Sequence, residues 1–237
     1  MKTRFENRAE AGKLLAESLR HYEGDPSVLV LGLARGGVPV AYEVAKKLRV
    51  PLDVFVVRKL GTPGNEELAM GAVASGGVRV LNREVVDGLG IPMEIVDTVT
   101  EQELRELNRR ETVYRSQRSP PDYEGKTVLL IDDGVATGAT LRSAIRAIRI
   151  HHPTRLVVAV PTAAGSTAAA LRKEVDEWIA LMTPEPFYAV GTWYADFGQT
   201  QDAEVCELLR NASEWSPGAG SEPRAKQAGR CPEPFSK

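Results

Sequence analysis

Two adjacent carboxylates stand where a buried strand ends and a loop of small residues begins. The stretch VLLIDDGVATGATL at residues 128–141 runs four apolar residues into Asp132 and Asp133. In parallel α/β sheets, ligands bind beyond the carboxyl ends of the strands, which is where this pair falls. The helix expected after the loop begins with unpaired N–H groups, to which Thr137 and Thr140 add hydroxyls. A phosphate on the loop and vicinal hydroxyls on the two carboxylates together describe a ribose 5-phosphate.

A simpler interpretation of the same residues stays open. Asp133 and Gly134 form a common turn pair, and Thr137 has the hydroxyl of a helix cap. Two familiar nucleotide-binding motifs do not fit this stretch. The lysine of the GxxxxGK[ST] pattern is absent, and no GxGxxG occurs.

Apolar segments alternate with helical patterns along the chain, which indicates a doubly wound, mainly parallel α/β sheet. We expect buried strands at residues 27–33, 51–57, 126–131, 155–161 and 175–181. We expect helices at 7–21, 38–48, 93–116, 137–150 and 166–174, a loop at 58–67, and a hairpin at 70–81 that turns at 75–77.

The opening stretch resembles the phosphoribosyl-pyrophosphate (PRPP) signature of type I phosphoribosyltransferases, and other segments agree in the right order. GLARGGVPVA (32–41) resembles that family's pyrophosphate loop, and VVRKLGTPGNEELAMGAV (56–73) resembles its strand end, flexible catalytic loop and hairpin. PEPFYAVGTWYADF (184–197) resembles its C-terminal hood. With the start FENRAEAGKLLA, the combination is closest to a bacterial group of predicted phosphoribosyltransferases whose base substrate is unsettled.

The resemblance implies the type I phosphoribosyltransferase fold, with a small C-terminal hood. The domain is expected at residues 1–211, with a core at about 28–182 and hood elements at about 1–22 and 183–211. Residues 212–237 are rich in Pro, Gly, Ser and charge, and their composition predicts a disordered tail.

The resemblance also implies roles for individual residues. The catalytic candidates are Arg35, Lys59, Asp132 and Asp133. The 5-phosphate would bind Ala136, Thr137, Gly138, Ala139 and Thr140. The pyrophosphate would bind Ala34, Arg35, Gly36, Gly37, Arg58 and Lys59, and the Ala34–Arg35 peptide would be cis, as is frequent in the family. A tight turn at 35–37 and solvated cations at 58–59 are the plainer alternatives.

Magnesium and a base complete the expected site. Mg²⁺ would sit on the pyrophosphate and the ribose hydroxyls, so Asp132 and Asp133 would reach it mainly indirectly, through those hydroxyls or through water. Phe187 is the candidate for stacking on the base, although an aromatic there also suits the core of the hood. Ala136 stands where 6-oxopurine-specific members carry an aspartate, which argues against hypoxanthine or guanine chemistry of that type.

The net charge of −2 gives no hint of a nucleic-acid or membrane surface. Two cysteines without metal-type spacing, and a start without an apolar signal core, fit a reducing cytoplasm. A homodimer is expected from the resemblance alone. The first functional hypothesis is an Mg²⁺-dependent phosphoribosyltransferase, because Arg35 and Lys59 serve departure of the leaving group. The alternatives are a PRPP- or nucleotide-sensing regulator without turnover, and a nucleotide hydrolase or phosphorylase on the same fold.

Overall fold

A five-stranded parallel sheet forms the centre of the protein, with strand order β2-β1-β6-β7-β8. The computed structural model describes residues 4–116 and 118–214. The strands are β1 (Val28–Leu33), β2 (Leu52–Phe55), β6 (Thr127–Ile131), β7 (Arg155–Thr162) and β8 (Glu177–Met182). This order confirms the predicted doubly wound, mainly parallel α/β sheet.

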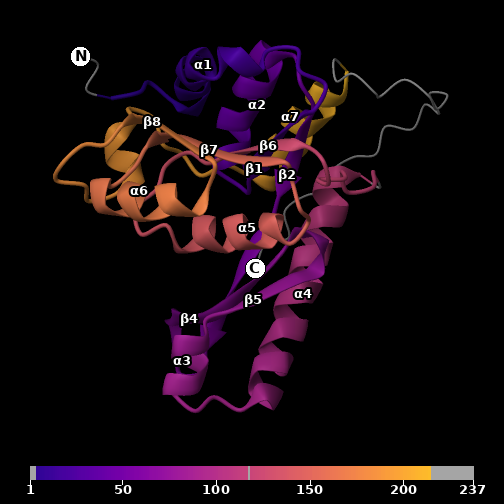
Figure 1. Ribbon diagram of the computed structural model, residues 1–237, viewed down its shortest axis with the longest axis vertical. Coiled ribbons are helices and arrows are strands. Elements are labelled where there is room, and N and C mark those ends of the chain that lie inside the picture. Colours follow the sequence, from indigo (N-terminus) through magenta and orange to yellow (C-terminus); the bar gives the residue numbers. More distant parts are fainter. Residues whose placement is uncertain (1–3, 117, 215–237) are drawn as a thin grey trace.

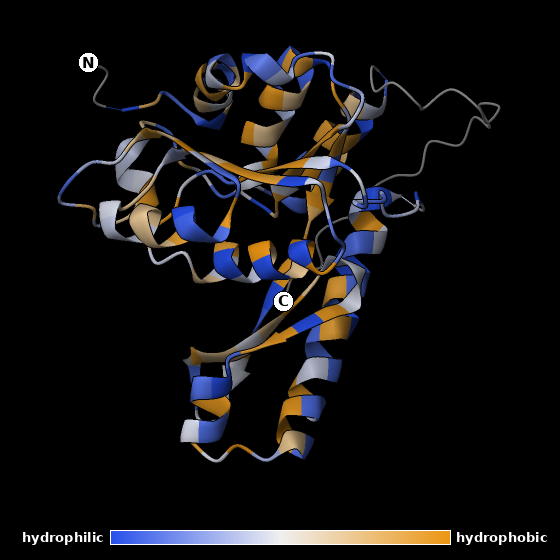
Figure 2. Ribbon diagram, viewed as in Figure 1, coloured by the Kyte–Doolittle hydropathy of each residue, from blue (hydrophilic) through white to orange (hydrophobic). Residues whose placement is uncertain are grey.

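Helices cover both faces of this sheet (Figure 1). One face packs against α1 (Arg8–Ser18), α2 (Gly37–Leu48) and α7 (Asp202–Ser213), and the other against α5 (Ala139–Arg149) and α6 (Gly165–Leu171). Neighbouring residues of one strand serve opposite cores, since Val30 packs with the first group and Leu31 with the second. Burial on both faces explains why the strands are mostly apolar, as Figure 2 shows at the centre of the molecule.

A second, antiparallel sheet extends away from the first (Figure 1). It consists of β3 (Val57–Thr62), β4 (Asn65–Ala74) and β5 (Val78–Leu81), flanked by α3 (Arg83–Gly88) and the long α4 (Met93–Arg115). The predicted hairpin with its turn at 75–77 is confirmed.

The loop predicted at residues 58–67 is wrong, because most of it is paired strand. Thr62 pairs with Asn65, so Pro63 and Gly64 occupy a two-residue turn in which Gly64 has φ 78°. A glycine adopts that backbone conformation without strain, and the residues on either side can therefore remain extended. The turn residues that suggested a long loop break the strand at one point only.

The long helix α4 is anchored to the edge of the main sheet by a buried ion-pair cluster. Arg115, 3% exposed, donates from Nε to Asp53 Oδ2 at 2.9 Å and from Nη1 to Glu111 Oε1 at 2.6 Å. Burial raises the pKa of Asp53, and the charge of Arg115 opposes that rise. Removing one partner of such a buried pair leaves an uncompensated charge, so the cluster fixes the end of α4.

The start of the described chain pairs with a segment late in the sequence, around Tyr194. Asn7 caps α1 as predicted, accepting the Glu10 N–H at 3.0 Å. Just before that cap, the Phe5 N–H donates to the Trp193 carbonyl at 2.9 Å, and the Ala195 N–H donates to the Phe5 carbonyl at 2.8 Å. Helix α7 runs to Ser213, so residues 212 and 213 of the predicted tail are helical. Residues 215–237 of that tail lie outside the described residues.

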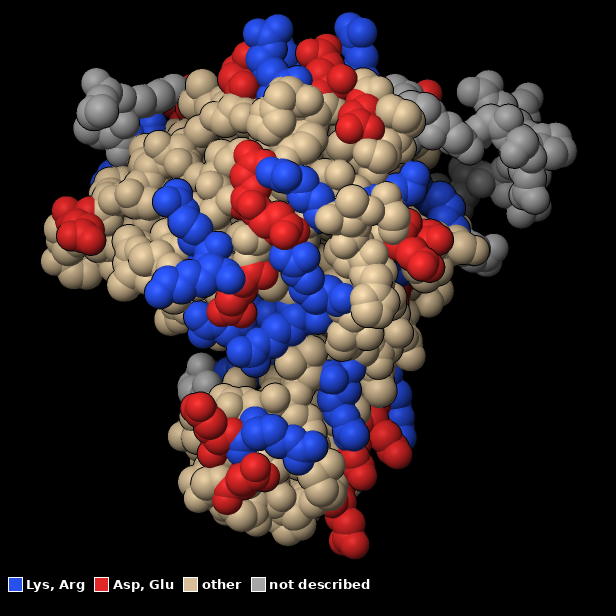
Figure 3. Space-filling view, viewed as in Figure 1, with Lys and Arg blue, Asp and Glu red and all other residues tan. Residues whose placement is uncertain are grey.

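The surface carries charges of both signs. In the view of Figure 3, Lys and Arg side chains gather across the middle of the face and Asp and Glu side chains lie among them. On α5, Arg142 pairs with Glu174 and Arg149 with Asp176. In the described part of the chain, no helix has the length and apolar character needed to cross a membrane.

Candidate active site

Three separate segments meet in a cavity of about 470 Å³ at the carboxyl ends of β1 and β6. They are the turn that follows β1, the acid pair with the start of α5, and residues 197–200, joined by one side chain from α1. The lining residues are Arg8, Leu33, Ala34, Arg35, Gly36, Asp132, Asp133, Thr140, Phe197, Gly198, Gln199 and Thr200. The structure therefore brings together residues that the sequence assigned to three parts of one ligand.

The turn after β1 packs directly against the acid pair. A Cβ on Gly36 would overlap Oδ2 of Asp133, and a Cβ on Gly37 would lie 2.6 Å from the Ile131 carbonyl oxygen. Both positions therefore need glycine for close approach rather than for an unusual backbone conformation. The Ala34–Arg35 peptide is cis, as expected from the resemblance.

The two carboxylates are held by neighbouring groups. The Asp133 N–H donates to Asp132 Oδ1 at 2.9 Å, and Arg8 Nε donates to Asp133 Oδ2 at 2.8 Å. The Tyr194 hydroxyl donates to the Asp133 carbonyl at 2.5 Å. Burial, followed by the negative charge of Asp133, raises the pKa of Asp132 well above its usual value. Burial also raises the pKa of Asp133, and the Arg8 guanidinium opposes that rise.

The loop after the acids leads into α5 through Gly138, which has φ 73°. The Thr167 hydroxyl donates to the Ala136 carbonyl at 2.6 Å, which fixes the loop to α6. Among the described residues, none accepts a hydrogen bond from the backbone N–H groups of residues 136–140. Thr137 is exposed in this loop, and Thr140 is exposed in the first turn of α5. The N–H groups and the two hydroxyls together are donors suited to an anion.

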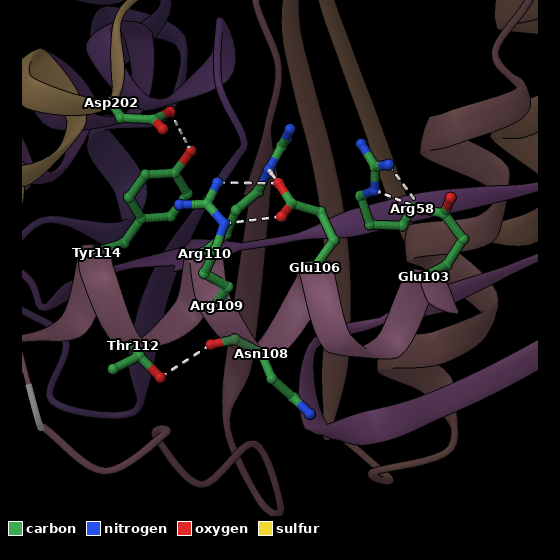
Figure 4. A network of polar contacts seen from close by, with 9 residues as sticks. All are labelled: Arg58, Glu103, Glu106, Asn108, Arg109, Arg110, Thr112, Tyr114 and Asp202. Atoms are coloured by element: carbon green, nitrogen blue, oxygen red, sulfur yellow. Dashed lines mark hydrogen bonds and ion pairs between the residues drawn. The ribbon is translucent and has the colours of Figure 1, made fainter. Parts of the chain in front are cut away.

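The predicted cations lie in different places. Arg35 lines the cavity, and its Nη1 is 3.6 Å from Asp202 Oδ1. Arg58 pairs with Glu103 of α4, with Nη2 2.6 Å from Oε2 (Figure 4). Lys59, the next residue of β3, projects to the opposite side of the strand, and neither it nor Arg58 lines the cavity.

Phe187 lies in a second cavity, of about 540 Å³, and does not line the first. The other lining residues are Ala164, Gly165, Ser166, Glu185 and Pro186. Because the Ala164 N–H donates to the Val135 carbonyl at 2.9 Å, this cavity borders the same loop that follows the acid pair. The Phe187 ring also packs 6.1 Å from the ring of Trp193, as the hood-core alternative expects.

Several cavity residues carried no signal in the sequence. Arg8 and residues 197–200 reach the cavity because the segment before α1 pairs with the segment around Tyr194. The cap at Asn7 predicts where the helix begins, but it does not indicate which loop the helix lies against.

Comparisons with known proteins agree with this geometry. The family described as "Phosphoribosyl transferase domain" matches residues 4–72 and 61–186. A curated Mycobacterium tuberculosis protein named "Putative phosphoribosyl transferase Rv0571c" is 45% identical over 208 residues, which cover 88% of this chain and 47% of that protein. The chain thus spans about half the length of the curated Mycobacterium tuberculosis relatives.

Two Thermus proteins are also similar. The crystal structure of TT1426 from Thermus thermophilus is 41% identical, with a TM-score of 0.78, and the match covers 90% of this chain and 100% of that one. The "Bifunctional protein PyrR" of Thermus thermophilus is 33% identical over 104 residues, which cover 41% of this chain and 57% of that protein.

Proposed function

The chain belongs to the phosphoribosyltransferase family, and from that premise we propose that it transfers the ribosyl 5-phosphate of PRPP to a nitrogen of a base or similar amine acceptor, releasing pyrophosphate. The observation that carries this proposal is the shared cavity, in which Asp132 and Asp133 lie against the Ala34–Gly36 turn and Thr140 lies in the first turn of α5.

The acid pair in the cavity and the adjoining loop, of which Thr140 lines the cavity, would hold the sugar. The N–H groups of residues 136–140 and the hydroxyls of Thr137 and Thr140 would bind the 5-phosphate at the start of α5. Asp132 and Asp133 would accept hydrogen bonds from the ribose hydroxyls, and C1 of the ribose would then lie toward the turn after β1. Holding both ends of the sugar orients the reacting carbon before the reaction begins.

The leaving group would depart toward the turn after β1. As the nitrogen lone pair of the acceptor forms the N–C1 bond, the C1–O bond breaks and its electron pair leaves with pyrophosphate, and the proton that the acceptor loses passes to solvent. Arg35 and the N–H groups of the turn, up to Gly37, would stabilise the negative charge that develops there. Arg58 and Lys59 would approach the pyrophosphate only if their strand moved toward the cavity.

The residues present fit a magnesium ion that is carried mainly by the substrate. Asp132 and Asp133 offer the hard oxygen donors that Mg²⁺ prefers. The described residues contain no group of three or more His, Cys, Asp or Glu side chains suited to a metal, so the ligands would be mainly substrate oxygens and water. Asp132 and Asp133 would reach the ion mainly through the ribose hydroxyls and water. When bound, Mg²⁺ would neutralise charge on the pyrophosphate.

The acceptor would be a base of unknown identity. The cavity that contains Phe187 borders the loop after the acid pair, so an aromatic ring stacked on Phe187 would remain close to the ribose. Ala136 offers no side-chain acid or base to that ring. The proposed acceptor is therefore not one whose ring must give up a proton to the side chain at position 136.

The test is pyrophosphate release from PRPP and Mg²⁺ across a panel of purine, pyrimidine and pyridine bases. Base-stimulated release supports the transferase. Tight PRPP binding without release for any base would favour a sensor instead, and turnover of a nucleotide without pyrophosphate would favour a hydrolase or phosphorylase.

A further inference from the structure

We propose that Arg8 is a positioning residue of this site, holding the Asp133 carboxylate in the orientation that receives the ribose. The inference rests on the proposed transfer reaction for its substrate. It adds a group from the first helix, far in sequence from the loops that carry the other assigned roles.

The Arg8 guanidinium is fixed from three directions. Nε donates to Asp133 Oδ2 at 2.8 Å, Nη1 donates to the Gly198 carbonyl at 2.7 Å, and the guanidinium carbon lies 3.9 Å from the centre of the Phe197 ring. The side chain is only 13% exposed, although it ends in a cavity lined by charged residues. A cation held on an aromatic face between two oxygen acceptors has little freedom to reorient.

The contact also determines which oxygen of Asp133 faces the ligand. Oδ2 is covered by Arg8 on one side and by Gly36 on the other, where even a methyl group would not fit. Oδ1 is therefore the oxygen that we assign to the ribose hydroxyl. Without Arg8, the carboxylate could rotate toward solvent or away from Asp132, whose negative charge repels it.

Contacts other than those of Arg8 also attach the first helix to the fold. The segment before α1 is already paired with the segment around Tyr194 through backbone hydrogen bonds, and Leu15 and Leu19 are fully buried. Among the side-chain contacts of Arg8, the hydrogen bond to Asp133 is the one that links the first helix to the acid pair.

The experiment measures PRPP affinity by calorimetry with Mg²⁺, together with pyrophosphate release, for Arg8→Gln, Arg8→Lys and Lys13→Gln. Lys13 lies on the exposed side of the same helix and serves as the matched control. Each substitution at Arg8 is also combined with Asp133→Asn, and thermal unfolding of every variant is recorded.

Arg8→Gln is expected to weaken PRPP binding by about 10- to 100-fold, because a charge-assisted hydrogen bond to the carboxylate is lost. Arg8→Lys keeps the charge but cannot reach both acceptors with the same geometry, so it should restore only part of the affinity. In the Asp133→Asn background, Arg8→Gln should add less than about threefold, since the two residues act as one unit. Lys13→Gln should match the wild type.

PRPP affinity of Arg8→Gln within twofold of the wild type would overturn the proposal. Effects of Arg8→Gln and Asp133→Asn that simply add would also overturn it, because they indicate a structural contribution. A wild-type protein that binds PRPP but releases no pyrophosphate overturns the transfer reaction alone, and the affinities then decide the role of Arg8. A wild type that binds no PRPP overturns both.

Discussion

Asp202, in the first turn of α7, faces Arg35 across the edge of the cavity, with Asp202 Oδ1 3.6 Å from Arg35 Nη1. The same oxygen accepts a hydrogen bond from the Tyr114 hydroxyl of α4 at 2.7 Å, as Figure 4 shows. Burial, together with Asp202, raises the pKa of Tyr114, so the hydroxyl stays protonated and continues to donate. The Asp202 carboxylate is therefore paired with Arg35, the cation that we assign to the departing pyrophosphate.

Asp202→Asn should strengthen the binding of pyrophosphate with Mg²⁺ by about two- to fivefold, because a partly exposed ion pair no longer competes for Arg35. Tyr114 keeps the amide oxygen as an acceptor, so folding should change little. Calorimetry of pyrophosphate binding measures the effect. Glu204→Gln, an exposed acid of the same helix turn, is the control, and equal or weaker binding by Asp202→Asn would contradict the competition.

Gly36→Ala should disrupt the site where the turn meets the acid pair. The new methyl group overlaps Oδ2 of Asp133, so the carboxylate or the turn must move. We expect PRPP affinity to fall by more than about tenfold and stability by about 1–3 kcal/mol. Gly88→Ala meets no atom within 4 Å and is the matched control. Unchanged PRPP binding by Gly36→Ala would show that this close approach is unimportant.

Phe187→Ala should act on the acceptor and spare PRPP. Loss of the stacking face is expected to raise the KM for the base by about tenfold and the KM for PRPP by less than about twofold. The neighbouring Tyr188, 81% exposed, provides the control Tyr188→Ala. Steady-state kinetics of pyrophosphate release measure both KM values. An equal rise in the two would indicate that Phe187 only packs in the core of the hood.

Glu106 of α4 should make the protein sensitive to acid. It accepts hydrogen bonds from Arg109 Nε at 2.7 Å and Arg110 Nε at 2.8 Å (Figure 4), and the bond from Arg109 leads the causes that lower its pKa to about 2. Because the folded pKa lies below the ordinary value of 4.5, the stabilisation is present above that pH and is lost as the pH falls toward 2.

Glu106→Gln should therefore lower the Tm by about 1–3 °C near neutral pH and converge with the wild type in strong acid. Circular dichroism melts across that pH range measure the difference. Glu101→Gln removes an exposed pair with Arg105 and should change little at any pH. A Tm difference between Glu106→Gln and wild type that stays constant with pH would contradict the assignment.

The sequence predicted the parallel sheet and the acid pair because both are local. The central strands β1 and β6 are apolar on both faces, and Asp132 and Asp133 follow β6 directly. The glycines of the turn after β1 were also predicted as site residues. The structure shows that they are needed because the turn packs closely against the end of the neighbouring strand. The carboxyl ends of parallel strands lie at the same edge of the sheet, where ligands bind. Residues that directly follow a strand can therefore be recognised as site candidates from the sequence.

The remainder of the cavity depends on long-range packing. Arg8 and Phe197 meet because the segment around Phe5 pairs with the segment around Tyr194, a contact that no local pattern encodes. At residues 58–67, Pro63 and Gly64 suggested a long loop. Pairing between β3 and β4 instead keeps the residues on either side of these two extended. Strand alternation then separates Arg58 from Lys59, which the sequence placed together.

The most direct test of the proposed transfer compares wild type with Asp133→Asn in base-dependent pyrophosphate release from PRPP and Mg²⁺. We predict release that one class of base stimulates, and a fall in kcat/KM of about 100-fold or more in Asp133→Asn, because the ribose loses a charged acceptor. Asp87→Asn, an exposed acid of α3, should behave as wild type. Tight PRPP binding with no base-stimulated release, or Asp133→Asn turnover equal to wild type, would contradict the proposed transfer.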